Sequence, residues 1–419
     1  MNYMATRAMP SASDRLGSDL AALVRRHVPG GPLERAFYTA PEVFEADLRQ
    51  VFYRRWLFAG HACAIPNPGD FFTWALGSET IVVVRGKEGE VRAFHNFCRH
   101  RGTRICNEEH GHARKLVCPY HRWTYDLDGS LITATKREFD VERSELSLFK
   151  VHLHNVAGLL FVNFSEDDPP DFSDVIETIA PQMAPHGLEK AKVAHTVDYV
   201  VKANWKIIFE NNRECYHCPS HHDEYNAATY DVMRDRALFD PKLQAELDAI
   251  TEAANARFRS LGLSEGNASS EMTGAYYRCH RTPLMKGYVT QSLDGAPVAP
   301  LMGDVPEVDT GTLRTTMFPN FWQHTNCDHA VAARITPIAA DLTHIRGIWL
   351  VDGKAVEGRD YTLGKLLPVW DQTNRQDWAI CEGQQIGVSS RRYVPGPFSK
   401  FRERNVAQFL DWYLGEMQR

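Results

Sequence analysis

The apolar residues between Gly60 and about Phe164 occur in short runs separated by turn residues, a texture typical of β-strands. Ile81–Val84 is an uninterrupted β-branched run. It is followed by a turn at Gly86–Gly89 and by a second apolar stretch at Val91–Phe97. This spacing predicts a β-hairpin, and a second turn at residues 126–129 predicts another.

Outside this region the apolar residues also follow a helical period. We predict helices near residues 14–27, from Pro41, and at 172–183, 205–216, 241–262 and 361–386, with strands at 193–201 and within 312–351. The helix from Pro41 carries apolar side chains at helical spacing: Val43, Phe44, Leu48, Val51 and Phe52. No βαβ rhythm is visible, so the pattern favours an α+β fold over a doubly wound sheet.

A composition change divides the chain. Residues 163–173 include Asp167-Asp168-Pro169-Pro170 and read as a linker. We therefore expect three parts: an N-terminal segment at 1–44 that packs on the last domain, an all-β domain at 45–164, and an α+β domain at 165–419.

Charge and hydropathy exclude several classes of protein. The chain has 419 residues and a net charge of -6, without a basic block that would indicate nucleic acid binding. No apolar run approaches the roughly 18 residues of a membrane span. Nine cysteines without an apolar leader predict free thiols, with Cys215 and Cys218 in packing roles, and a cytoplasmic location.

Two short clusters carry mixed metal ligands. Cys98 and His100 form a C-x-H cluster and, after 17 intervening residues, Cys118 and His121 form C-x-x-H. A [2Fe–2S] centre with two cysteines on one iron and two histidines on the other needs such a set, and the imidazoles raise its reduction potential. A structural Cys₂His₂ zinc site is the alternative, but zinc motifs usually pair cysteine with cysteine and histidine with histidine.

A second group of ligands follows residue 210. Glu214 and His217 are three residues apart, hence on one face of the helix predicted there. Pro219 must break this helix, so that the chain can turn back and present a second imidazole from His221 or His222. Two histidines and one carboxylate bind non-haem Fe(II) and leave positions open for O₂.

The C-terminal helix offers Asp371, Asp377 and Glu382 as the third ligand. Asp377 shares the helix face of Trp370, whereas the other two acids fall on the face of Arg375. A carboxylate on an apolar stripe needs a partner, and a metal ion is one, so we choose Asp377.

At this point the residues resemble a known family. C-x-H followed by C-x-x-H, then Asn204-Trp205-Lys206, an acid three residues before a histidine, and H-x-x-x-x-H are similar to the Rieske non-haem iron oxygenases of the α-subunit type. Within that family three segments resemble the glycine betaine monooxygenase and stachydrine demethylase branch, with the carnitine monooxygenases more distant: 210–218, 355–358 and 394–400.

The resemblance implies an all-β Rieske domain joined to a helix-grip α+β catalytic domain, in a ring-shaped homotrimer. It implies that His217 and His222 bind the mononuclear iron with Asp377, and that Glu214 is the carboxylate that connects a cluster histidine with an iron histidine. In many members of the family that residue is Asp. His221 becomes a neighbour of the iron site.

The same resemblance implies a terminal oxygenase. A separate flavin or ferredoxin-type reductase would take hydride from NAD(P)H and deliver single electrons, and O₂ would be used to hydroxylate an N-methyl group of a quaternary ammonium compound. Loss of formaldehyde then completes N-demethylation. The alternatives are a ring-hydroxylating dioxygenase and a simple Rieske electron carrier. The carrier needs only about a hundred residues, far fewer than this chain contains.

A quaternary ammonium group would need aromatic faces, because it cannot donate an ordinary hydrogen bond. The candidates lie in the strands expected to face the C-terminal helix: Phe321, Trp322 and Trp349, with Phe318, Tyr276 and Tyr230 as further choices. A core role is the more common one for such residues. The sequence does not select the Arg, His or backbone donor that would bind a substrate carboxylate.

Overall fold

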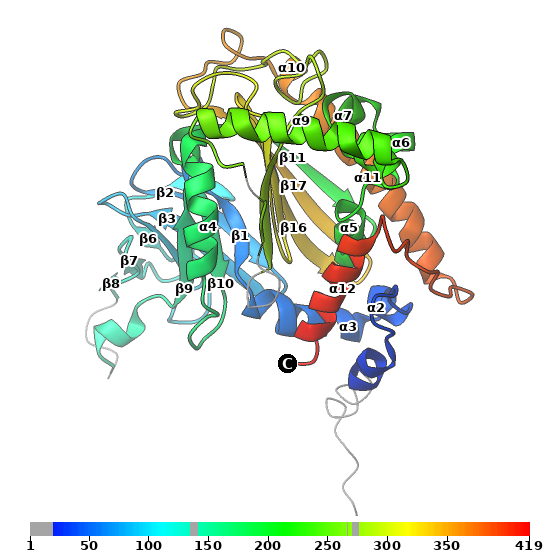
Figure 1. Cartoon of the computed structure of the whole chain (residues 1–419). Coiled ribbons are helices and arrows are strands. Elements are labelled where there is room, and N and C mark those ends of the chain that lie inside the picture. Colours follow the sequence, from blue (N-terminus) through cyan, green and yellow to red (C-terminus); the bar gives the residue numbers. More distant parts are fainter. Residues whose placement is uncertain (1–19, 135–140, 266, 270–275) are drawn as a thin grey trace, which may run out of the picture.

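The computed structural model describes residues 20–134, 141–265, 267–269 and 276–419, and these residues form three antiparallel sheets with flanking helices (Figure 1). In the part of the chain so described, no helix is long and apolar enough to cross a membrane. The helix predicted near residues 14–27 is present at 20–26, and its beginning lies outside the described residues.

The first sheet contains seven strands in the order β1-β10-β9-β4-β3-β2-β5. Its strands are β1 Leu57–His61, β2 Asp70–Leu76, β3 Glu79–Arg85, β4 Val91–His95, β5 His110–His112, β9 Lys150–Val156 and β10 Leu159–Asn163. The hairpin predicted around Gly86–Gly89 is confirmed by the pairing of β3 with β4. A three-stranded sheet comprises β6 Leu116–Val117, β7 Thr124–Tyr125 and β8 Leu131–Thr133, which confirms the turn at 126–129.

The second large sheet also has seven strands, in the order β11-β17-β16-β15-β14-β13-β12. They are β11 Ala191–Val201, β12 Asn267–Ser269, β13 Tyr277–Thr282, β14 Thr312–Met317, β15 Phe321–Thr325, β16 His329–Ala339 and β17 Leu342–Asp352. All neighbours are antiparallel, as expected of an α+β chain without βαβ units.

Helices surround this sheet, with α4 near the first sheet, α9 across one end, and α5, α7 and α11 on the side away from the first sheet (Figure 1). Their bounds are α2 Ala36–Thr39, α3 Pro41–Ala46, α4 Ser173–Met183, α5 Trp205–Asn212, α6 Cys218–His221, α7 Asp223–Ala228, α8 Asp231–Ala237, α9 Pro241–Ser260, α10 Leu363–Leu366, α11 Pro368–Ser389 and α12 Arg404–Glu416. A π-helical turn occupies Asp47–Val51, and 3₁₀ turns occupy Phe52–Arg54, Ala62–Ala64, Arg143–Leu146, Ala184–His186 and Leu188–Lys190.

Two predicted helices were too long. The helix that begins at Trp205 ends at Asn212, because the Glu214 side chain accepts the backbone N–H of Tyr216 and competes with helical hydrogen bonding. The last long helix begins at Pro368 and not near residue 361. Proline lacks a backbone N–H and suits a first helical turn but not a helix interior.

A buried carboxylate in the π-helical turn after α3 connects this part of the chain with α5 and α12. Asp47 is fully buried and accepts hydrogen bonds from the indole of Trp205 (2.9 Å), the hydroxyl of Tyr413 (2.6 Å) and the ammonium of Lys206. Since burial of an unpaired charge is costly, these donors hold Asp47, α5 and α12 together. These contacts therefore fix the position of α5, from which the loop carrying Glu214 and His217 begins.

Candidate iron–sulfur and mononuclear iron sites

The two cluster loops have the same backbone design. The backbone carbonyl of Cys98 accepts the N–H of Gly102, and its backbone N–H donates to the carbonyl of Thr103. In the same way, the backbone carbonyl of Cys118 accepts the N–H of Arg122, and its N–H donates to the carbonyl of Trp123. Gly102 and Arg122 both adopt positive φ, 75° and 61°. Each loop thus presents a cysteine and a histidine in an equivalent manner.

The four donors of these loops are sorted by depth. The sulfurs belong to buried side chains, with Cys98 2% and Cys118 1% exposed, while His121 is exposed. The rings of His100 and His121 meet edge to face, with centroids 4.7 Å apart, and His100 stacks on Trp123. Burial raises the pKa of Cys98, and the neighbouring Cys118 thiol raises it further. Two inner thiols and two outer imidazoles fit the asymmetric ligation of a Rieske [2Fe–2S] cluster.

The second ligand group converges on one point. His217 Nε2 lies 3.1 Å from His222 Nε2 and 3.1 Å from Asp377 Oδ1, and His222 Nε2 lies 3.0 Å from the same oxygen. Two ligands bound at right angles to one metal ion at about 2.1 Å lie about 3 Å apart. The triangle therefore fits one face of an octahedral iron site.

The outer nitrogen of each imidazole is also engaged. His217 Nδ1 pairs with Glu214 Oε1 at 2.6 Å, and His222 Nδ1 pairs with Gln376 Oε1 at 2.8 Å. These oxygens accept a hydrogen bond from Nδ1–H, which directs the Nε2 lone pairs of both rings at the triangle.

The pKa shifts of these side chains indicate that the triangle can hold a positive charge. Burial lowers the pKa of His217, but the carboxylates of Asp377 and Glu214 outweigh it and raise that pKa to about 9. Burial raises the pKa of Asp377, yet both histidines hold it below its usual range. A positive charge is thus stabilised between these side chains, and a divalent metal ion would displace the protons.

Local sequence explains how the two histidines meet. Pro219 stands in the first turn of α6, and the helix ends after one turn at His222, whose φ and ψ are not helical. His221 turns away and hydrogen-bonds to the His217 carbonyl, so it is not part of the triangle. The prediction that Glu214 and His217 share a helix face was wrong, since both lie in the loop between α5 and α6.

The α11 acids separate as the helix wheel predicts. Asp377 points at the histidines, whereas Asp371 accepts the Tyr199 hydroxyl at 2.7 Å and pairs with Arg375. Glu382 accepts the backbone N–H of Lys202 at 3.0 Å.

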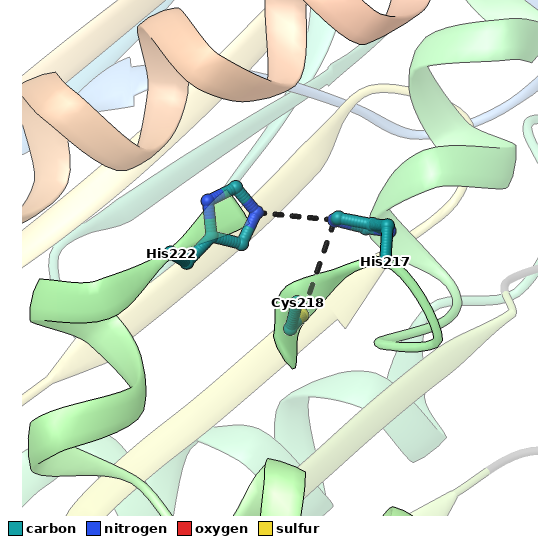
Figure 2. Close-up of side chains that lie close together, drawn as sticks. All are labelled: His217, Cys218 and His222. Carbon is teal, nitrogen blue, oxygen red and sulfur yellow. Dashed lines mark hydrogen bonds between the residues drawn. The ribbon is translucent and has the colours of Figure 1, made fainter. Parts of the chain in front are cut away.

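Cys218 is the other potential ligand near the triangle. Its sulfur lies 3.9 Å from His217 Nε2, and Figure 2 shows it below the two imidazoles. The sulfur is joined to Cys215 in a disulfide, so it carries no thiolate for a metal. The prediction that these two cysteines are free thiols with packing roles was wrong. C-x-x-C spacing was the available signal.

A cavity of about 370 Å³ opens beside the triangle. His217, His222 and Asp377 line it, as do three indoles: Trp322, Trp370 and Trp378. Two rows of cross-strand neighbours on β13, β14 and β15 form one wall: Arg278, Thr316 and Trp322, and His280, Arg314 and His324.

The predicted substrate aromatics do not all reach this cavity. Trp322 lines it, but Phe321 packs 4.4 Å from Phe58, measured between ring centroids, in an apolar cluster on the other face of the sheet. Neighbouring residues on a strand point to opposite faces, so only one of this pair can face the cavity. Trp349 is fully buried in another apolar cluster and is not part of the cavity wall.

Sequence reasoning missed the charged residues of the wall. The alternation Arg278-x-His280 and the polar residues at Arg314 and Thr316 share one strand face, and this period of two was the signal that could have found them.

Both sites lie within segments that match known protein families. Residues 55–142 match the Rieske [2Fe-2S] domain, and residues 188–419 match the ring hydroxylating alpha subunit (catalytic domain). The chain therefore belongs to the ring-hydroxylating α-subunit family of Rieske oxygenases, and it is an oxidoreductase with a Rieske cluster and a mononuclear iron that uses O₂.

Individual relatives are similar over most of their length. The glycine betaine monooxygenase oxygenase subunit of Pseudomonas aeruginosa (strain UCBPP-PA14) is 38% identical over 92% of this chain and 89% of its own. That of Chromohalobacter salexigens is 37% identical over 100% and 93%. Among solved structures, the quaternary ammonium Rieske monooxygenase CntA with inhibitor MMV12 has a TM-score of 0.69 at 20% identity, covering 99% of this chain and 100% of that chain. This last likeness confirms the predicted fold, a Rieske domain plus an α+β catalytic domain.

Proposed function

We propose that this chain is a terminal oxygenase component that hydroxylates an N-methyl group of a quaternary ammonium compound of the glycine betaine or stachydrine type. The observation that carries the proposal is the cavity in which the His217, His222 and Asp377 triangle lies with three indoles. A permanent cation is recognised by aromatic faces, and a C–H bond held beside the iron is the one that reacts. The identity to glycine betaine monooxygenase subunits supports this substrate class.

The overall reaction balances with two external electrons. O₂, two electrons, two protons and the N-methyl group give an N-hydroxymethyl group and water. Cleavage of its C–N bond then releases formaldehyde and a proton and leaves a tertiary amine. A flavin or ferredoxin-type reductase that oxidises NAD(P)H supplies the electrons. The bound iron supplies the activation of O₂.

The chain's own residues have separate tasks in this proposal. Cys98, Cys118, His100 and His121 hold the cluster, and His217, His222 and Asp377 hold the mononuclear iron. Gln376 and Glu214 fix the imidazole tautomers through Nδ1. The partly exposed Glu214 also connects the iron histidine with a cluster histidine, in our proposal one of a neighbouring subunit in a homotrimer.

We also propose that the three parts of the chain meet at residues 44 and 164. The proposed location of the protein is the cytoplasm. Contacts of the N-terminal segment support its packing on the catalytic domain: Tyr38 donates a hydrogen bond to Glu210 of α5 at 2.7 Å.

The deciding experiment is turnover of the purified oxygenase with a compatible reductase and NADH, scoring formaldehyde and O₂ uptake. The substrates are glycine betaine, stachydrine, carnitine and an aromatic acid. We expect formaldehyde in a 1:1 ratio to O₂ consumed with a betaine. Formation of a cis-diol from the aromatic acid, without formaldehyde from any quaternary amine, would identify a ring dioxygenase. An iron content of two per chain would leave only an electron carrier.

A further inference from the structure

The cavity beside the iron triangle is lined by five arginines: Arg213, Arg234, Arg278, Arg314 and Arg402. Three of them have carboxylate partners within the cavity wall. Arg314 and Arg234 pair with Asp231, at 2.7 and 3.6 Å, and Arg402 pairs with Asp235 at 2.5 Å. The two carboxylates of these pairs therefore offset most of the charge of the three guanidinium groups.

Arg213 differs from these three. It is 7% exposed, and its Nε and Nη2 atoms are buried without a hydrogen-bond partner. Among residues 20–134, 141–265, 268–269 and 276–419, no carboxylate oxygen lies within ion-pair distance of its guanidinium. The group lies over the rings of Phe318, at 5.4 Å, and Tyr276, at 6.0 Å.

A buried cation without an anion is expensive. Moving a guanidinium out of water costs more than contact with aromatic faces returns. Burial lowers the pKa of Arg213 to about 10, so the group still carries its charge at neutral pH. The Arg213 guanidinium is therefore a buried positive charge in this wall for which the described residues supply no carboxylate.

Arg213 lies close to the mononuclear iron site, both in the sequence and in the cavity. It directly precedes Glu214, whose Oε1 faces His217 Nδ1, and it lines the same cavity as both iron histidines. Two further wall residues have a buried Nδ1 without a partner, His280 and His324. Burial and nearby arginines lower the pKa of both imidazoles, so they are neutral and can each donate one N–H.

We propose that Arg213 binds the anionic group of a zwitterionic quaternary ammonium substrate, while the indoles of Trp322, Trp370 and Trp378 contact its cationic end. This inference rests on the proposed function and refines it. A betaine carries a carboxylate that can fill the vacant side of the guanidinium, whereas choline has the same trimethylammonium group and no anion. Arg213 thus selects betaines over cationic amines.

The test is isothermal titration calorimetry of the full-length, iron-loaded oxygenase with glycine betaine and with choline. Removal of one partner of a buried charge pair costs 2 kcal/mol or more, so Arg213→Gln should weaken glycine betaine binding by about 30-fold or more. Choline binding should change by less than about threefold. Arg213→Lys should recover part of the betaine affinity, because it restores the charge without the two-pronged geometry. Equal weakening of both ligands would overturn the inference.

Arg334→Gln is the matched control. Arg334 is also a buried arginine, 6% exposed, but it lies over Trp74 and donates to the Ala59 carbonyl outside this cavity. Its replacement should lower stability and leave the ratio of betaine to choline affinity unchanged. If Arg213→Gln does not fold, the ratio of betaine to choline affinity is measured in Arg213→Lys instead. A ratio equal to that of wild type overturns the proposal.

A third ligand separates this inference from the proposed function. Benzoate offers a carboxylate without a cation, and Arg213-dependent binding as tight as that of glycine betaine would overturn the assignment to zwitterions. If wild type binds glycine betaine through Arg213 but releases no formaldehyde, the proposed reaction fails and the binding role stands. If formaldehyde forms but glycine betaine binding does not depend on Arg213, the proposed reaction stands and the binding role of Arg213 fails.

Discussion

The carboxylate of Asp377 lies 3.0 Å from the Nε2 atom of His222, although 155 residues separate them in the chain. The α11 helix delivers the acid and the kink after α6 delivers the imidazole, so the site forms only when both pack on the same side of the second large sheet.

Asp377→Ala should lose the mononuclear iron and formaldehyde release and keep the visible spectrum of the Rieske cluster. One of three protein ligands is removed, while the cluster loops are untouched. Metal analysis should fall from three irons to two per chain, with two acid-labile sulfides retained. Asp371→Ala on the same helix is the control, since its partners are Tyr199 and Arg375. Full iron content in Asp377→Ala would refute the ligand assignment.

Glu214→Gln should load both iron centres and slow reoxidation of the reduced cluster by O₂ and substrate by roughly 10-fold or more. Glutamine retains an oxygen for His217 Nδ1–H but loses the charge that stabilises the histidine chain during electron transfer. Stopped-flow absorbance of the cluster in a single turnover measures this. Glu382→Gln, whose carboxylate accepts a backbone N–H of Lys202, should behave as wild type. An unaltered rate in Glu214→Gln would remove its role as a connector.

The double variant Cys215→Ser/Cys218→Ser should keep the mononuclear iron. The sulfur of Cys218 is near His217 but belongs to a disulfide, and Asp377 supplies the third donor. Alkylation followed by mass spectrometry, with and without reductant, should reveal the Cys215–Cys218 bond in wild type. Loss of iron in the double variant with Asp377 intact would instead make Cys218 a ligand.

Trp322→Leu should weaken glycine betaine binding by about 2- to 30-fold, the range expected when a cation–π contact is lost. The adjacent Phe321→Leu is the control. Its ring packs between Phe58 and Phe161, so it should lower the melting temperature without changing the dissociation constant. Equal effects of both variants on the dissociation constant would contradict the placement of Trp322 in the cavity.

Glu210→Gln should stabilise the protein at high pH. Burial raises the pKa of Glu210 from 4.5 to about 7, against the opposing effects of Tyr38 and Lys206. The folded state therefore binds more protons than the unfolded chain between these values, and wild-type stability falls as pH rises through this window. The variant does not titrate at this position, so it is spared a decrease in the free energy of unfolding that reaches about 3 kcal/mol once the pH has passed through the whole window. Thermal unfolding at pH 5 and pH 8 should show a difference that grows with pH. A constant difference would show that Glu210 does not titrate there.

The helices and strands could be predicted wherever local pattern and turn chemistry agreed. The β3–β4 hairpin and α9 are present as expected, because apolar periodicity and Gly, Asp and Pro signals act within a few residues. The end of α5 was misjudged, because the contact of Glu214 with the Tyr216 N–H competes with helix bonds in a way that apolar spacing does not record.

Ligand type and spacing are local properties, so the residues alone were enough to predict the candidate iron ligands and the short segments that carry them. Which of these side chains lie together depends on the folded arrangement of distant segments. The fold brings Asp377 to His217 and His222, turns Trp322 toward the cavity and Phe321 away, and buries Arg213 where the described residues supply no carboxylate. These outcomes depend on packing between segments far apart in the chain, where the burial of charge and the choice of sheet face are settled.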